Sequence, residues 1–177
     1  MTERPIGRDF SARAWRGLGP HPHEPRAIEA AERVAALIVA ARPGTRIEHV
    51  GSTAVPGLVG KGVIDLQITA PAGDIPRIAR GLLELGFCPQ SGRDPWPETR
   101  PMVVGTFRHA GLVFGLHCHV VPDHDPRVRE MPQFRDRLRQ DSALRDAYAA
   151  EKQRIARTTG DVHEYTRAKA EFIQRVR

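Results

Sequence analysis

The first helices of the chain are marked by apolar residues that recur every three or four positions. This spacing predicts a helix over residues 24–42, closed by Pro43. A second helix is predicted between Asp74, a favourable N-cap residue, and Gly86, a residue type that commonly ends helices. Both helices present one apolar side and one polar side, so each is expected to cover a hydrophobic layer.

The last third of the chain has the same helical periodicity without strand patterns. It predicts three helices, over residues 127–139, 142–157 and 162–176. Asp161 and Glu164 have the spacing of a capping box at the start of the last helix. The C-terminal region is therefore expected to be helical throughout.

The middle of the chain carries strand patterns instead. Residues 62–69 are β-branched and apolar, as expected for a strand buried on both faces, and a short helical turn over 54–59 leads into them. Further strands are predicted over residues 45–50, 87–89, 102–108 and 112–121. The last two flank His109-Ala110-Gly111 and are predicted to form a hairpin.

Strands in the middle and helices at both ends predict an α+β fold, with a mixed sheet flanked by helices and a helical C-terminal region. We expect a single domain over residues 24–177, preceded by an N-terminal extension over residues 1–23. A polar loop is expected over residues 92–98.

The composition narrows the class of protein. The 177 residues suffice for one domain with its own core, and no apolar run reaches the roughly 18 residues of a membrane span. The start of the chain has no secretory h-region and the two cysteines have no C-x-x-C spacing, so we expect a cytoplasmic location and buried thiols. The net charge of +6 favours anionic ligands, although genome composition could produce the same arginine bias.

The most informative segment reads IEHVGSTAVPGLVGKGVIDLQI, over residues 47–68. A strand runs into Gly51 and Ser52, where the absent glycine side chain lets a phosphate approach backbone N–H groups and the serine hydroxyl adds a donor. The short helix expected next would add the partial positive charge of its N-terminus. On the following strand, Asp65 and Gln67 project from the same face and form a plausible edge of a Mg²⁺ site.

These features resemble the nucleotidyltransferase fold, in which a Gly-Ser pair holds the triphosphate and two carboxylates on the following strand bind metal. The finer similarity is to the GrpB family within that superfamily. It rests on HVGSTAVPGL, Lys61 with VIDLQI, LHCHV, FRDRLR and YTRAKAEFI, which occur in order between Ile47 and Ile173. The resemblance implies binding of a nucleotide or another phosphorylated small molecule, with Gly51 and Ser52 at the phosphates.

The chain departs from an active transferase pattern at its carboxylates. Gln67 is neutral, and His117 and His119 stand where a third carboxylate is expected. We predict a divalent metal site of Asp65, Gln67, His117 and His119, holding Mg²⁺ or Mn²⁺, or Zn²⁺ because imidazole suits it better. The two histidines need a further metal ligand, and His49, His109 and Asp65 are the candidates for it. Alternatively, His117 and His119 are neutral side chains held by hydrogen bonds.

Other cationic residues are candidates for contacts with phosphate. Lys61 and Lys169 fall within the GrpB-like features, and Arg135 lies in FRDRLR. The plainer alternatives are a solvated pair of Lys169 with Tyr165 and a salt bridge of Arg135 with Asp136. Asp65 could likewise pair with an arginine, and Gln67 could bridge backbone groups.

Two functions from different classes follow from this pattern. In the first, Asp65, Gln67 and His119 are catalytic, and an NTP is bound with a divalent metal for nucleotidyl transfer. In the second, the same pocket binds a phosphorylated ligand, or assists a partner, without catalysis. No aromatic stripe is interleaved with basic residues, so nucleic acid is not the expected partner, and neither is a membrane.

Overall fold

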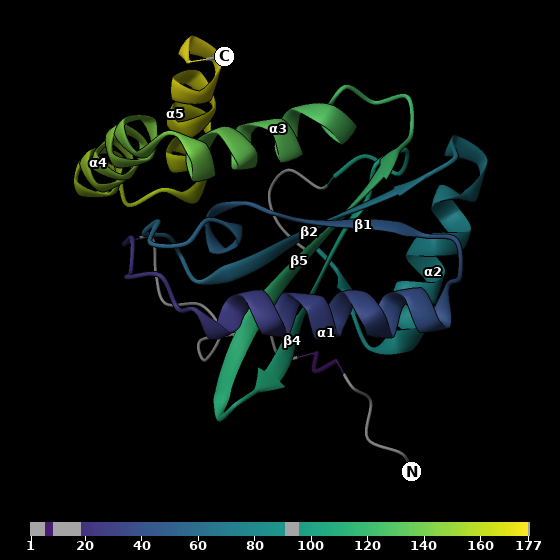
Figure 1. The fold of residues 1–177 in the computed structure, drawn as a ribbon. Helices are drawn as coiled ribbons and strands as arrows, with labels where there is room; N and C mark the ends of the chain where they lie inside the picture. The colour runs from purple at the N-terminus through teal and green to yellow at the C-terminus, as the bar shows by residue number, and fades with distance from the viewer. Residues whose placement is uncertain (1–5, 9–18, 91–95, 177) are drawn as a thin grey trace.

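The computed structural model describes residues 6–8, 19–90 and 96–176, and has the α+β architecture that the sequence predicts. Its centre is a five-stranded sheet with the strand order β1-β2-β5-β4-β3. The strands are β1 (Arg46–Val50), β2 (Val63–Ala70), β3 (Cys88–Pro89), β4 (Met102–His109) and β5 (Leu112–Pro122). Five α-helices and two short 3₁₀ helices, η1 and η2, surround the sheet in the described part of the chain (Figure 1).

The helices divide between the two faces of the sheet. They are α1 (Arg26–Ala41), η1 (Ser52–Ala54), η2 (Ala72–Asp74), α2 (Ile75–Leu85), α3 (Arg127–Gln140), α4 (Ser142–Thr158) and α5 (Val162–Arg175). Figure 1 shows α1 and α2 on one side of the sheet and α3 on the other, with α4 and α5 beside α3. The sheet is therefore the middle layer of three.

The sheet is mixed because its central pair is parallel. β2 pairs with β5 in parallel, whereas β1, β4 and β3 each join in antiparallel fashion. The β4–β5 hairpin turns at Ala110 and Gly111, with φ of 46° and 80°, as two-residue turns of twisted hairpins require. In the parallel register Asp65 lies opposite His117 and Gln67 opposite His119. Their side chains share one face of the sheet.

The main core fills the space between the sheet and α1 with α2. Alternate residues of the central strands point into it, and Leu66 and Leu116 are completely buried there. From α1, Val34 and Ile38 are equally buried, which accounts for the periodicity of that helix. Cys118 lies in the same core, and burial raises the pKa of its thiol, so it is the inert thiol expected from the sequence.

A second, smaller core holds the C-terminal helices to the loop after β1. Val55 and Leu58 from that loop contact Leu138 of α3 and Tyr148 of α4. The Tyr148 ring also stacks on Phe172 of α5, with ring centroids 5.4 Å apart. These contacts fix the C-terminal helices against the loop between β1 and β2.

One expected element is wrong, and one expected cap does not form. The helical turn over 54–59 is instead the single 3₁₀ turn η1, and the chain then bends at Gly57, whose φ is 78°. A turn this short supplies no helix-dipole contribution to anion binding. Asp74 precedes α2 but caps no N–H group and pairs with Arg77, whereas Asp161 does cap α5.

The described residues before Glu24 pack onto the domain. Ile6 belongs to the main core with 2% exposure, and Gly7 pairs with Thr106 of β4. His21 pairs with Gly60 just before β2. No helix among the described residues is long and apolar enough to cross a membrane.

The burial of β2 predicts that shortening its core side chains will destabilise the protein. Leu66→Ala should lower the free energy of unfolding by about 3 kcal/mol, because a cavity is left in a completely buried site. Val39→Ala on the exposed side of α1, where Val39 is 41% exposed, should cost less than about 1 kcal/mol. Urea unfolding of the two variants measures the difference, and equal losses would contradict the core described here.

Candidate functional site

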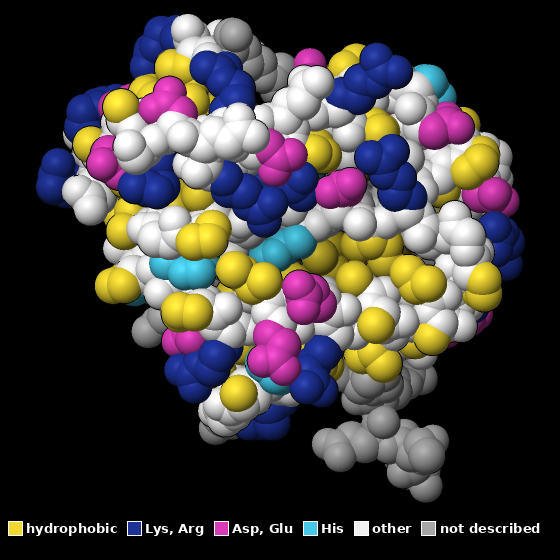
Figure 2. Space-filling view, viewed as in Figure 1, with side chains coloured by type: hydrophobic (Ala, Val, Ile, Leu, Met, Phe, Trp, Pro, Cys, Tyr) yellow, Lys and Arg dark blue, Asp and Glu magenta, His cyan; other side chains and the backbone are white. Residues whose placement is uncertain are grey.

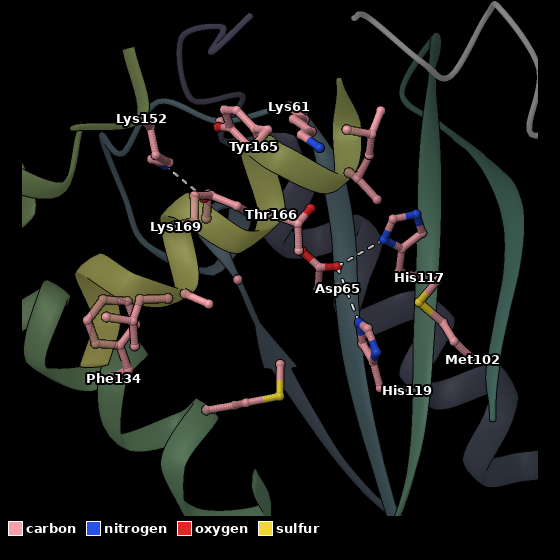
Figure 3. A pocket seen from close by; sticks show the side chains of 18 of the residues that line it. Lys61, Asp65, Met102, His117, His119, Phe134, Lys152, Tyr165, Thr166 and Lys169 are labelled. Atoms are coloured by element: carbon pink, nitrogen blue, oxygen red, sulfur yellow. Dashed lines mark hydrogen bonds and ion pairs between the residues drawn. The ribbon is translucent and has the colours of Figure 1, made fainter. Parts of the chain in front are cut away.

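A cavity of about 1320 Å³ lies between the second face of the sheet and the C-terminal helices. Its walls come from the loop after β1, from β2, β4 and β5, and from α3, α4 and α5. Figure 3 shows Asp65, His117 and His119 on one side of it, with Lys61, Lys152 and Lys169 on the other. The cavity is large enough for a nucleotide-sized ligand.

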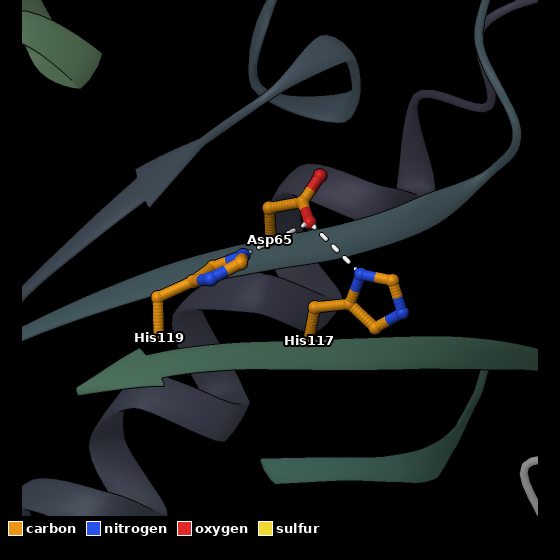
Figure 4. Close-up of side chains that lie close together, drawn as sticks. All are labelled: Asp65, His117 and His119. Carbon is orange, nitrogen blue, oxygen red and sulfur yellow. Dashed lines mark ion pairs between the residues drawn. The ribbon is translucent and has the colours of Figure 1, made fainter. Parts of the chain in front are cut away.

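Asp65 and the two histidines of β5 form one cluster in this cavity (Figure 4). The Asp65 Oδ1 atom lies 3.3 Å from His117 Nδ1 and 3.6 Å from His119 Nε2. All three side chains are partly buried, and each could offer one ligand atom within 4.8 Å of the others. The register of β2 with β5 brings them together, since the side chains of opposite residues point to the same face.

The electrostatics of the cluster keep Asp65 ionised. Burial acts to raise the pKa of its carboxyl, but hydrogen bonding and charge from His117 and His119 outweigh burial and hold the pKa well below its usual range. The His119 ring also packs edge-on against Trp96, with centroids 5.1 Å apart. The cluster thus combines an anionic oxygen with two imidazole nitrogens of restricted orientation.

These three donors fit a divalent transition metal. Ligands of a tetrahedral ion, each about 2.1 Å from the ion, lie about 3.4 Å from one another, close to the separations of Asp65 from its two histidines. Two histidines and one carboxylate favour Zn²⁺, Mn²⁺ or Fe²⁺ over Mg²⁺, which prefers oxygen ligands. Of the three further ligands left open by the sequence, Asp65 is the one beside the histidines. His49 instead contacts Thr53, and His109 pairs with Glu29.

The turn between β1 and β2 is held against this cluster by Gly51. Its φ is 74°, in the left-handed region, and a Cβ atom there would collide with the Asp65 carboxylate. Only glycine combines that backbone conformation with so close an approach. The next residue, Ser52, also lines the cavity, where its Oγ contacts Lys152 Nζ.

All three lysines of the chain line this cavity, although lysines are rare beside 24 arginines. Lys61 and Lys169 lie over the Tyr165 ring, 4.6 and 5.1 Å from its centroid. Burial, reinforced by Lys169, lowers the pKa of Lys61 to about 8. Burial also lowers the pKa of Lys169, against the opposing effect of Asp65. A bound anion would stabilise the charged forms of these side chains.

Lys152 is a cavity residue that the sequence patterns did not single out. It is 2% exposed on α4, and its Nζ lies 2.9 Å from Ser52 Oγ and in contact with the Val59 carbonyl. Burial, reinforced by Lys169, lowers its pKa to about 7. The signal that could have found it is the scarcity of lysine in an arginine-rich chain, because two of the three lysines already fell in recognisable motifs.

The arginines have a different distribution. Many form ion pairs on the surface, such as Arg33 with Glu29 and Arg154 with Glu151. On the face drawn in Figure 2, the Lys and Arg side chains are interspersed with acidic ones, and no continuous basic track crosses it. The surface charge of this face therefore gives no sign of a nucleic-acid binding track.

Two predicted site residues have other partners. Arg135 lines the cavity, but its guanidinium donates to Glu48, to Asp136 and to the His49 carbonyl, which is the salt-bridged arrangement that the sequence left as the alternative. The completely buried Gln67 donates from Nε2 to the Val128 carbonyl, while its Oε1 has no hydrogen-bond partner among the described residues. Its amide thus ties β2 to the start of α3.

Two solved structures have a fold similar to that of this chain. The chain resembles the Cid1 poly(U) polymerase with MgGTP bound, with a TM-score of 0.50 and 12% identity over 72% of this chain and 42% of that one. It resembles the conserved protein GrpB of Enterococcus faecalis more strongly, with a TM-score of 0.65 and 19% identity over 89% of this chain and 98% of that one. The fold is that of the nucleotidyltransferase-like proteins.

Sequence comparison identifies the family. The model of the GrpB protein family matches residues 21–177, so the chain belongs to the GrpB family. UPF0157 proteins of Pseudomonas aeruginosa and Deinococcus radiodurans are 37% and 32% identical to it, over 83% and 77% of this chain. The matched region spans 60% of the Pseudomonas protein and 68% of the Deinococcus protein.

The buried Lys152 predicts a pH dependence of stability. Its pKa is about 7 in the folded protein and ordinarily 10.5, so between these values the unfolded chain binds more protons and stability rises with pH. Lys152→Met removes this contribution. The free energy of unfolding of the variant minus that of the wild type should therefore be about 2 kcal/mol more positive at about pH 6.5 than at about pH 9. Urea unfolding at both pH values measures the change, and a difference independent of pH would contradict it.

Proposed function

We propose that this protein binds a nucleotide, or another phosphate-bearing small molecule, together with a divalent metal ion in the cavity between the sheet and the C-terminal helices. The observation that carries the proposal is the division of charge inside one cavity. Asp65 with His117 and His119 offers a cation site, while the three lysines face the same space. A ligand with phosphate groups that also contact a metal satisfies both sides.

The proposal gives each group a role. Asp65, His117 and His119 hold the metal, which would neutralise phosphate charge, and Gln67 lies beside His119 on the neighbouring strand with a buried Oε1. Gly51 and Ser52 bring the loop after β1 to the phosphates, where Lys61 and Lys169 supply positive charge. Arg135 supports the site from α3 through Glu48 and the His49 carbonyl.

Nucleotidyl transfer is the second candidate function. It is favoured by the arrangement of the Gly51-Ser52 turn directly before a carboxylate-bearing strand, within a fold similar to that of a polymerase described with MgGTP. Asp65 and His119 would then lie at the reacting phosphate. The non-catalytic alternative is favoured by the single carboxylate, because one negative charge neutralises less of a two-metal arrangement than three carboxylates do.

Metal binding is the first test. The wild-type protein should bind Mn²⁺ and Zn²⁺ more tightly than Mg²⁺, because two of its three donors are imidazole nitrogens. Asp65→Asn, His117→Ala and His119→Ala should each weaken Zn²⁺ binding by at least about 100-fold in isothermal titration calorimetry. The control is His124→Ala, because the His124 side chain is 72% exposed, pairs with Asp123 and is not part of the cluster. The Zn²⁺ affinity of this variant should be unchanged. Equal affinity in all five proteins would refute the metal site.

Ligand binding is the second test. ATP with Mn²⁺ should raise the melting temperature, and Lys61→Met and Lys169→Met should each weaken ATP binding by about tenfold through loss of a charged contact. Arg33→Met removes the same charge from an exposed surface pair and should leave the affinity unchanged. Equal weakening by all three variants would show that only net charge matters.

Catalysis is tested separately from binding. Incubation with each of four α-labelled NTPs, in Mg²⁺ and in Mn²⁺, would reveal transfer of the label and release of pyrophosphate. Label transfer that is lost in Asp65→Ala supports nucleotidyl transfer. Metal-dependent ATP binding without transfer under any of these conditions supports the binding module instead.

A further inference from the structure

The contact between Ser52 and Lys152 joins two segments that are 100 residues apart in the sequence. Ser52 begins η1, directly after the turn at Gly51, and Lys152 comes from the middle of α4. Lys152 Nζ lies 2.9 Å from Ser52 Oγ and also contacts the Val59 carbonyl. Both side chains line the cavity of the proposed ligand site.

The position of the Ser52 hydroxyl is restricted on a second side by Gly60. A Cβ atom on Gly60 would lie 2.7 Å from Ser52 Cβ and 3.2 Å from Ser52 Oγ, which is too close for any larger residue without a shift. The backbone at Gly60 is in turn held by paired hydrogen bonds with His21. Ser52 is therefore oriented by packing as well as by its hydrogen bond to Lys152.

The surroundings of Lys152 favour a neutral amine. Among the described residues no carboxylate forms an ion pair with it, and the charge of Lys169 on α5 acts against a positive charge on it. The neutral ring of Tyr148, on its own helix, lies 4.7 Å from Nζ. A neutral amine has two N–H groups and one lone pair, whereas an ammonium ion has three N–H groups and no acceptor. In the neutral form one N–H group can donate to Val59 while the lone pair accepts the Ser52 proton.

We propose that Ser52 and Lys152 form a nucleophile and general-base pair, which transfers a phosphoryl or nucleotidyl group from a phosphoanhydride substrate to the Ser52 hydroxyl. The geometry has the three parts such a pair needs: a nucleophile, a base within hydrogen-bond reach of it, and a third group, the Val59 carbonyl, that orients the base. The substrate class rests on the function proposed above, whereas the reactivity of Ser52 does not.

The step balances within these residues. Ser52 Oγ forms a bond to phosphorus as its proton passes to Lys152 Nζ. The bond from phosphorus to the bridging anhydride oxygen breaks, and its electron pair leaves with that oxygen, which takes the proton from Lys152. Water or an acceptor hydroxyl then attacks the phosphorus carried by Ser52, and its proton passes to Lys152 Nζ. The bond from phosphorus to Ser52 Oγ breaks, and its electron pair stays with Oγ, which takes that proton back from Lys152.

A fluorophosphonate probe tests the pair directly, because it presents an electrophilic phosphorus and needs neither metal nor natural substrate. Intact-mass spectrometry of the wild-type protein should show one adduct, which peptide mapping should place on Ser52. Ser52→Ala should abolish the adduct, and Ser142→Ala, at the start of α4 outside the cavity, should leave it unchanged. The labelling rate should rise through about pH 7, where Lys152 loses its proton.

The Lys152 variants separate a base from a structural contact. Lys152→Met should slow labelling by about 100-fold, as expected for loss of general-base catalysis. Lys152→Arg retains N–H donors for Ser52 and Val59 but is always protonated and cannot accept a proton, so its labelling should be equally slow. Melting curves of both variants report whether the fold is retained, and Ser52→Ala provides a test that does not depend on a buried charge.

The outcomes distinguish this proposal from the function above. A wild-type protein that binds ATP and metal but forms no adduct at Ser52 would overturn the nucleophile assignment and leave the binding function standing. Labelling of Ser52 at the wild-type rate in Lys152→Arg would overturn the role of Lys152. An adduct on Ser52 in a protein that binds neither ATP nor metal would retain the pair and reject the proposed ligand class.

Discussion

The parallel pairing of β2 with β5 is the constraint on which the rest of the structure depends. In this register the residues opposite one another are Asp65 with His117, Gln67 with His119, and Leu66 with Cys118. Because successive side chains of a strand alternate between faces, the same two strands form the centre of a hydrophobic core on one side and a polar cluster on the other. A shift of one residue between the strands would separate the carboxylate from its histidines.

The polar face accounts for the position of the C-terminal helices. An apolar helix packed flat over Asp65, His117 and His119 would bury charged and polar groups without partners, which is costly. The helices instead pack through Tyr148 and Leu138 onto Val55 and Leu58, to one side of the cluster. The cavity is the space that this arrangement leaves, with Asp65, His117 and His119 on one side and the three lysines on the other.

The lysines and many of the arginines of this protein lie in different environments. Arginine stays charged under nearly all conditions and forms planar pairs with carboxylates, as Arg154 does with Glu151 on the surface. Lysine changes its pKa readily on burial, and the pKa of Lys61 and that of Lys152 are lowered to about 8 and about 7. Side chains of this kind can respond to a bound anion, or accept a proton, near neutral pH.

Local sequence patterns determine most of the secondary structure of this protein. Apolar periodicity predicted the five helices and the strands of the sheet, because one face of each element must be buried. The two-residue spacing of Asp65 and Gln67, and that of His117 and His119, placed each pair on one strand face. The prediction failed where a short segment depends on packing against its neighbours. The helical turn expected over 54–59 is a single 3₁₀ turn instead, because the chain bends at Gly57 and because Val55 and Leu58 pack against the C-terminal helices.

Only the tertiary structure decided the partners of these side chains. The sequence could not show that Asp65 lies beside two histidines rather than an arginine, that Arg135 pairs with Glu48, or that Gln67 reaches Val128. Lys152 lies in no recognisable motif, and its partner Ser52 is 100 residues away in the sequence. Periodicity reports which face of an element is buried, whereas a contact across layers depends on strand register and helix packing, which arise only when the whole chain is folded.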